Sequence, residues 1–191
     1  MLLTAGIGRA GEWSGYVALE GRYFFQEGLA PSQHYDSNLS ISAEPEYYHD
    51  WDDGRQGLVF RPFVRLDQRD DERTHWDIRE LEWTYAGPGW ETRVGIGKVY
   101  WGVTEAWHLV DVINQTDLVE NPDGEQKLGQ PMLKFSSERD WGTVDFFLLP
   151  GFRERTYPGK DGRIRTHPWV DTEQAKFESG AGNKRVDAAV R

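Results

Sequence analysis

The sequence predicts an all-β fold: an antiparallel up-and-down meander of about eight strands that forms part of a transmembrane β-barrel. Three observations predict it. Apolar and polar residues alternate over successive segments, aromatic residues stand at the ends of these segments, and short turns alternate with long loops. A mean hydropathy of −0.71 fits a barrel, because only every second strand residue must face lipid.

Each strand is expected where the alternation is clear. Pro45 and Pro62 fall within two of these segments and predict bulges or an edge, because proline has no amide hydrogen for the ladder. In the fourth strand Trp76 and Ile78 are out of phase with the residues that follow, which predicts a bulge near Arg79. The strands are expected at residues 13–25, 38–48, 57–67, 76–85, 90–100, 132–138 and 143–153, and in the last segment, 183–191.

The fifth strand shows the pattern best. Its outward row is apolar and runs from Trp90 to Tyr100, which would lie roughly 23 Å apart along the membrane normal. That distance matches an apolar band of about 25 Å with an aromatic residue at each edge. Lys98 falls on the outward face and must snorkel or mark a bulge. Gly95 and Gly97 face inward and indicate a close approach of another backbone.

One short helix is expected in the loop after the fifth strand. Thr104 is a candidate N-cap, apolar residues follow at helical spacing as far as Ile113, and Asn114 can end the helix. The barrel interior beside Gly95 and Gly97 can bury this apolar stripe. The alternative is a surface loop with its own small core.

Loop length orients the predicted barrel. Turns after the fourth and sixth strands are short and loops after the fifth and seventh are long, as in outer-membrane barrels with extracellular long loops. Residues 1–10 lack the features of a secretory signal, and residues 183–191 alternate to the last position. We therefore expect residues 1–191 to be a single domain, the N-terminal portion of a larger barrel that is incomplete at both ends. An open sheet is expected for such a fragment.

Inward positions carry charges whose sign changes from strand to strand. Opposite charges on neighbouring strands lie within cross-strand reach. They form either an ion-pair ladder that satisfies a polar lumen or a transverse field that orients a permeating solute. The predicted pore-lining residues are Glu44, Glu46, Arg61, Arg65, Glu80, Glu82, Arg93, Lys134 and Asp145.

Other functional classes find little support. The net charge of −10 argues against a nucleic-acid partner, and without cysteine there is neither a disulfide framework nor thiolate chemistry. No hydrolase, metalloprotease or nucleotide-binding motif occurs, so we expect no enzyme, no catalytic residue and no cofactor. Two oxygen-rich turns, residues 50–54 and 121–125, lack the EF-hand pattern, so no metal site is expected.

Three motifs carry a resemblance to a known group of proteins: WGVTE (Trp101–Glu105), DVINQTDL (Asp111–Leu118) and LPGFRERTYPG (Leu149–Gly159). They resemble motifs of uncharacterised proteobacterial outer-membrane β-barrel proteins of the porin-like and alginate-export-like group. The resemblance implies a barrel of more than eight strands, cleaved from a signal peptide. It makes Trp101, Glu105, Asp111 and Asn114 candidates for a pore constriction, and His108 is the one histidine near them.

These observations lead to two hypotheses of different classes. The first is a porin-like channel in the bacterial outer membrane for passive passage of small polar or anionic solutes, with residues 102–131 narrowing the pore. Its partners would be outer-membrane lipid and the solute, and a homo-oligomer is compatible with it. The second is a soluble β-sandwich that binds carbohydrate through exposed Trp and Tyr side chains.

Overall fold

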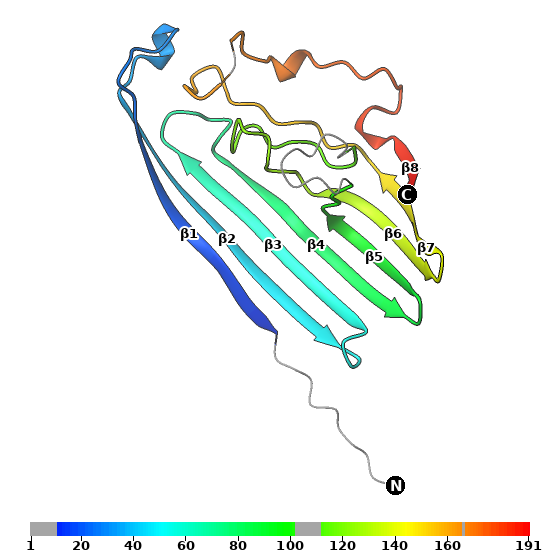
Figure 1. The fold of residues 1–191 in the computed structure, drawn as a ribbon. Coiled ribbons are helices and arrows are strands. Elements are labelled where there is room, and N and C mark those ends of the chain that lie inside the picture. Colours follow the sequence, from blue (N-terminus) through cyan, green and yellow to red (C-terminus); the bar gives the residue numbers. More distant parts are fainter. Residues whose placement is uncertain (1–10, 102–111, 166) are drawn as a thin grey trace.

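A computed structural model describes residues 11–101, 112–165 and 167–191. Within these ranges, antiparallel strands form one eight-stranded sheet in which neighbours in the chain are neighbours in the sheet (Figure 1). The predicted all-β meander is confirmed. The strands are β1 (Glu12–Tyr23), β2 (Ser37–Trp51), β3 (Gln56–Asp67), β4 (His75–Gly87), β5 (Trp90–Gly97), β6 (Gln130–Arg139), β7 (Gly142–Pro150) and β8 (Val186–Val190), with single 3-10 turns η1 (Pro31–Gln33), η2 (Thr172–Gln174) and η3 (Gly182–Lys184).

The sheet is open. β1 pairs with β2 and β8 pairs with β7, and the two outer strands lie on opposite sides of the sheet (Figure 1). These eight strands therefore do not close a barrel.

One face of the sheet, which we call the apolar face, is apolar on every strand. The register places Trp83 between Leu58 and Val94, and Leu133 between Val94 and Leu148. These side chains form continuous rows across the strands rather than isolated contacts. Exposed members of this face include Trp13, Val17, Leu19, Leu39, Ile41, Val64, Leu66, Trp76, Leu81, Val94, Leu133, Phe146, Leu148, Val186 and Val190.

Connections of different length lie at the two ends of the sheet. At one end the strands are joined by tight turns, residues 52–55, 88–89 and 140–141. At the other end lie the longer connections, residues 24–36, 68–74, 98–129 and 151–185 (Figure 1). The predicted asymmetry is confirmed, and it extends to all the connections between strands.

Aromatic side chains gather at the end with the tight turns. The Trp13 and Tyr47 rings lie 5.0 Å apart, and Trp90 contacts Tyr85 at 5.3 Å and Phe135 at 6.1 Å, measured between centroids. Near the opposite end of β1, the Tyr23 and Phe25 rings are 5.2 Å apart. Aromatic residues thus stand at both ends of β1, as the alternation predicted.

Both predicted irregularities appear in the strand pairing. Ala43 pairs with Val64 and Tyr47 with Phe60, a register that puts Pro45 opposite Pro62, where the pairing of β2 with β3 is interrupted. Arg61 pairs with Glu80 but Pro62 pairs with Ile78, so Arg79 is the extra residue of a bulge in β4. The bulge restores the phase, and Trp76 and Ile78 join the apolar face as a result.

The fifth strand is shorter than predicted. β5 ends at Gly97, so Tyr100 is not part of it, and the expected span from Trp90 to Tyr100 is wrong. Lys98 is half-buried, and the charges that act on it belong to Arg79, Glu80, Glu44 and Arg61. It therefore does not lie on the apolar face as expected. Because β5 ends at Gly97, the strand alternation does not extend to Lys98 and does not determine its direction.

Gly95 and Gly97 give space to the neighbouring strand rather than to a helix. A Cβ at Gly95 would lie 1.9 Å from the carbonyl oxygen of Leu81, and one at Gly97 would lie 2.4 Å from the carboxylate of Glu82. A backbone does approach closely at Gly95, but it is that of β4.

The described residues of the loop between β5 and β6 contain no helix. The predicted segment falls largely on residues 102–111, outside the described ranges, and its expected end, Ile113–Asn114, forms bends. The physical reason is the Asn114 side chain, which accepts from the Val99 amide at 2.7 Å and donates to the Gly97 and Leu128 carbonyls at 2.9 Å. It links the backbone of residues 97–99 to that of Leu128 instead of ending a helix.

Candidate functional site

The polar face, opposite the apolar face, carries the predicted pore-lining residues. Arg61 of β3 faces carboxylates on both neighbouring strands. Its Nη1 lies 2.6 Å from Glu80 Oε2, its Nε donates to Glu46 at 2.7 Å, and Glu44 is 3.8 Å away. The cross-strand register produces this arrangement, since Arg61 pairs directly with Glu80.

The ion pairs continue along the sheet. Arg93 lies 3.4 Å from Glu82 and 2.6 Å from Glu91, and Lys134 lies 3.5 Å from Asp145. The predicted ion-pair ladder is therefore present. Pairs that remain partly exposed contribute only about 0–1 kcal/mol each to stability. This ladder therefore mainly gives each charged group of the polar face a partner of opposite charge, and it stabilises the fold little.

Residues 112–129, which we call the folded loop, pack onto this face at the end with the long connections. Their backbone forms a hairpin, in which the Asp117 amide donates to the Gln126 carbonyl and the Leu128 amide to the Gln115 carbonyl, both at 2.8 Å. Ile113 is buried with Met132 and Phe147 of the sheet. Ile113 is the member of the predicted apolar stripe that lies within the described residues, and it is buried against the polar face of the sheet.

Two arginines hold the folded loop at Val119 and Glu120. Arg65, a predicted pore-lining residue, is buried and places Nη2 2.8 Å from Glu120 Oε2. Arg73, which was not predicted, is also buried; it donates to the Val119 carbonyl at 3.2 Å and pairs with Asp67 at 2.9 Å. Arg65 therefore anchors a loop that lies on the polar face.

The bulge residue Arg79 holds the same loop by its Asp117. Arg79 Nη1 donates to Asp117 Oδ2, and both side chains are buried. The Arg79 guanidinium also lies over the Phe63 ring, 4.3 Å from its centroid. The phase break in the sequence located the bulge, but no pattern pointed to Asp117 or Glu120 as partners of the sheet.

The structure brings together two of the predicted constriction residues. Trp101 and Ile113 both belong to the small apolar cluster around Phe147, and Asn114 bonds to Val99 in the same place. Glu105, His108 and Asp111 lie outside the described residues. The described candidates thus anchor the base of the folded loop.

An open hollow of about 300 Å³ lies between the sheet and the folded loop. Its arginines already bind carboxylates or backbone carbonyls, so it offers a balanced set of charges, with the half-exposed Tyr16 at its side. Such a lining suits water and small polar molecules. The residues around it are Tyr16, Glu20, Glu44, Phe63, Arg65, Arg73, Arg79, Glu120, Asn121 and Gln126.

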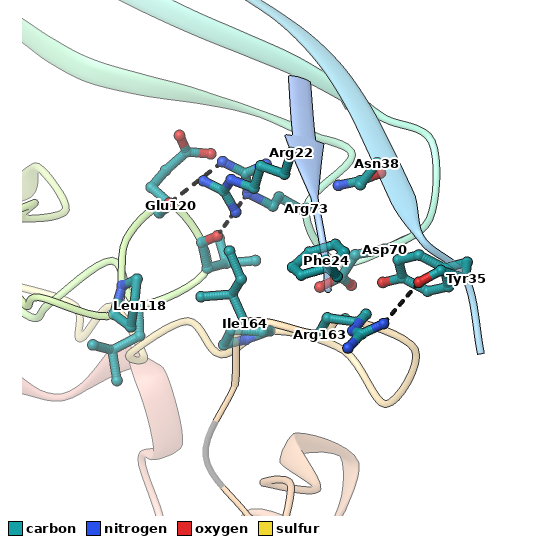
Figure 2. A pocket seen from close by; sticks show the side chains of 14 residues that line it. Arg22, Phe24, Tyr35, Asn38, Asp70, Arg73, Leu118, Glu120, Arg163 and Ile164 are labelled. Atoms are coloured by element: carbon teal, nitrogen blue, oxygen red, sulfur yellow. Dashed lines mark hydrogen bonds between the residues drawn. The ribbon is translucent and has the colours of Figure 1, made fainter. Parts of the chain in front are cut away.

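The β7–β8 connection also contacts two other long connections, residues 24–36 and 68–74, at the rim of the sheet. Figure 2 shows Arg163 between Phe24 and Tyr35; its guanidinium lies 4.4 Å from the Phe24 ring centroid and donates to the Tyr35 carbonyl at 2.7 Å. Asp70 accepts from the Gly159 amide at 3.0 Å, and burial raises the pKa of the Asp70 carboxyl. The cavity between these groups measures only about 20 Å³, so the rim is closely packed.

No group of three or more His, Cys, Asp or Glu side chains in the described ranges could hold a metal ion. No helix in those ranges is long and apolar enough to cross a membrane.

Comparison with protein-family models, with curated proteins and with solved structures finds no match to this chain. The resemblance to outer-membrane barrel proteins therefore stays a prediction from the sequence.

Proposed function

We propose that this chain forms wall strands of a porin-like channel in the bacterial outer membrane, which passes small polar solutes. One observation carries the proposal: a single sheet has an exposed apolar face across all its strands and an ion-paired polar face behind it. Soluble proteins rarely expose an apolar patch larger than a few hundred Å². Contact with lipid removes the free-energy cost of exposing this apolar face to water.

Two further features support the orientation and the role of the folded loop. Tight turns at one end and long connections at the other are typical of outer-membrane barrels, in which the long loops are extracellular. The folded loop lies on the polar face, where in the proposed channel it narrows the pore. The proposed constriction segment is 102–131, and its described residues, 112–131, are the ones that support this role.

Fractionation tests the membrane location. We expect the protein, expressed in a Gram-negative host, to sediment with outer membranes and to migrate differently on a gel before and after heating. A protein that stays folded in solution without detergent contradicts the channel and supports the alternative, a soluble carbohydrate-binding domain. The exposed Trp13 and Trp76 would then be candidate sugar platforms.

Planar-bilayer recording tests the constriction. The Gln115 carbonyl and the Leu128 amide are already hydrogen-bonded, so residues 116–127 can be replaced by an Asn-Gly turn without moving the ends. We expect a larger single-channel conductance from this variant, because the body of the folded loop is gone. A control variant shortened by residues 175–181, which are almost all exposed, should keep the conductance of the wild type. An unchanged conductance after the first replacement removes the folded loop from the pore.

A further inference from the structure

Three parts of the chain meet at one fully buried carboxylate. Asp117 of the folded loop has no exposed surface. Its Oδ2 accepts from Arg79 of β4, and its Oδ1 accepts from the hydroxyl of Thr156 at 2.5 Å. Thr156 belongs to the long connection between β7 and β8. A single side chain therefore joins the sheet to both long loops.

The backbone reinforces this junction. Asp117 and Thr156 form a parallel bridge, and the Val119 amide donates to the Thr156 hydroxyl at 3.3 Å. The Thr156 hydroxyl thus donates to one residue of the folded loop and accepts from another. Movement of either loop would break both bonds.

The arginine on the sheet side has little freedom. As the bulge residue of β4, Arg79 is turned onto the polar face, where it is buried over the Phe63 ring. An arginine held in this way presents its guanidinium in one orientation. The position of the guanidinium therefore determines where the Asp117 carboxylate lies.

A second link runs parallel to the first. Asp77 of β4 accepts from Arg153 Nη2 at 2.8 Å, and Arg153 Nη1 donates to the Gly129 carbonyl at 2.8 Å. This link again joins the sheet, the β7–β8 connection and the folded loop. Arg79 Nη1 also lies 3.7 Å from Asp77 Oδ2, so the two links meet at β4. Two links between the same three parts restrain rotation as well as separation.

We propose that Asp117 is a positioning residue that fixes the folded loop and residues 153–156 as one rigid plug on the sheet. Opening the plug would separate the buried Asp117 from both Arg79 and Thr156, which is costly for a charged group. The hollow beside the plug then keeps a constant width. The rigidity is independent of the proposed channel, but its consequence for solute passage, a static constriction rather than a gate, rests on that proposed function.

Spin-label distances test the rigidity, and the absence of native cysteine allows labels at chosen positions. One label is placed by Asp123→Cys on the folded loop and the other by Asp140→Cys at the β6–β7 turn; both residues are exposed. We expect a narrow distance distribution that broadens in Asp117→Asn. The matched control is Asp145→Asn, which removes a buried carboxylate of the same face that bonds to Ser136, Lys134 and Arg191 but not to the loop. It should leave the distribution narrow.

A milder pair of variants keeps the test valid if Asp117→Asn fails to fold. Thr156→Val removes one hydroxyl, and we expect exchange of the Asp117 and Leu128 amide hydrogens to become roughly tenfold faster. Thr156→Ser, which restores the hydroxyl, should return exchange to the wild-type rate.

Each outcome decides the proposal. Broadening in Asp117→Asn alone, or rescue by serine at position 156, supports it. Equal broadening in Asp145→Asn, or unchanged exchange in Thr156→Val, overturns it. A rigid plug in a protein that forms no channel would refute the proposed function and leave this inference standing.

Discussion

At the scale of single residues, the polar face combines predicted positions with partners that were not predicted. Arg61 lies on the expected face and binds the expected carboxylates on neighbouring strands. Arg65 lies on the expected face too, but its closest carboxylate partner, Glu120, comes from a loop distant in the sequence. Alternation defines which way a strand residue points. It carries no information about what folds over that residue.

Among the glycines within the described residues, Gly95 is the least able to accept a side chain. Its φ of 140° lies where other residues are strained, and a Cβ there would meet the Leu81 carbonyl. We expect Gly95→Ala to lower the free energy of unfolding by about 3 kcal/mol or more, from backbone strain together with the clash. Urea unfolding in lipid or detergent measures the loss. Gly21→Ala on β1, whose Cβ would meet only a Leu39 methyl at 3.4 Å, should cost far less; equal costs would contradict this reasoning.

Lys98 is expected to make stability depend on pH. Burial lowers the pKa of its ammonium, and Arg79 lowers it further. Between the folded and unfolded pKa values the unfolded chain binds more protons, so stability rises as the pH rises through that range. Lys98→Met should be more stable than the wild type at neutral pH, and this advantage should shrink at alkaline pH. Unfolding of both proteins at several pH values measures this, and an advantage that is independent of pH would exclude Lys98 as the cause.

At the scale of elements, the bulge in β4 has two effects. It returns Trp76 and Ile78 to the apolar face, and it turns Arg79 toward the folded loop. The first effect could be predicted from the sequence, because the phase break is local. The second could not, because it depends on where a distant loop packs.

Deleting Arg79 tests the first effect. Without the extra residue, either Trp76 and Ile78 move to the polar face or the residues after them move to the apolar face, since a shift of one residue reverses the faces of a strand. We expect the deletion to prevent folding, as judged by loss of protease resistance. Arg79→Ala keeps the bulge and should fold with reduced stability. A deletion variant as stable as Arg79→Ala would show that the bulge does not set the phase.

The loop after β5 is the element that the sequence predicted least well. Helical spacing of apolar residues was a weak signal, because Ile113 packs against Met132 and Phe147 from a bend. The Asn114 side chain supplies hydrogen bonds that a helix would otherwise satisfy within itself. Of the predicted constriction, Trp101 and Asn114 form the base of the loop. Of the residues that fix its body, Arg65 was predicted as a pore-lining residue, whereas Arg73 and Thr156 were not predicted as site residues.

At the scale of the whole molecule, the two faces of the sheet predict different responses to charge. Leu133 lies within the apolar face and is 41% exposed, and Phe177 lies on a long loop and is 43% exposed. On a soluble protein, arginine at either position would change stability by no more than about 0.5 kcal/mol. In a bilayer, arginine on the lipid-facing side of a strand costs about 2–4 kcal/mol near the midplane.

We therefore expect Leu133→Arg to destabilise the protein by about 2–4 kcal/mol in lipid vesicles and Phe177→Arg to have little effect. Urea unfolding of the two variants in the same vesicles measures the difference. Similar small effects at both positions would contradict a lipid-facing sheet, whatever the role of the polar face.

By itself the sequence determined the meander, the direction of each strand residue, the tight turns and the bulge. These features follow from a period of two residues and its interruptions, which depend only on neighbours along the chain. Only the tertiary structure decided where β5 ends, how Lys98 is buried, and that Asp117 binds Arg79 and Thr156. The partners of Asp117 lie far from it along the chain and follow no period. Their contact forms because two loops are buried on the same face of the sheet, and a pattern of neighbouring residues cannot predict that burial.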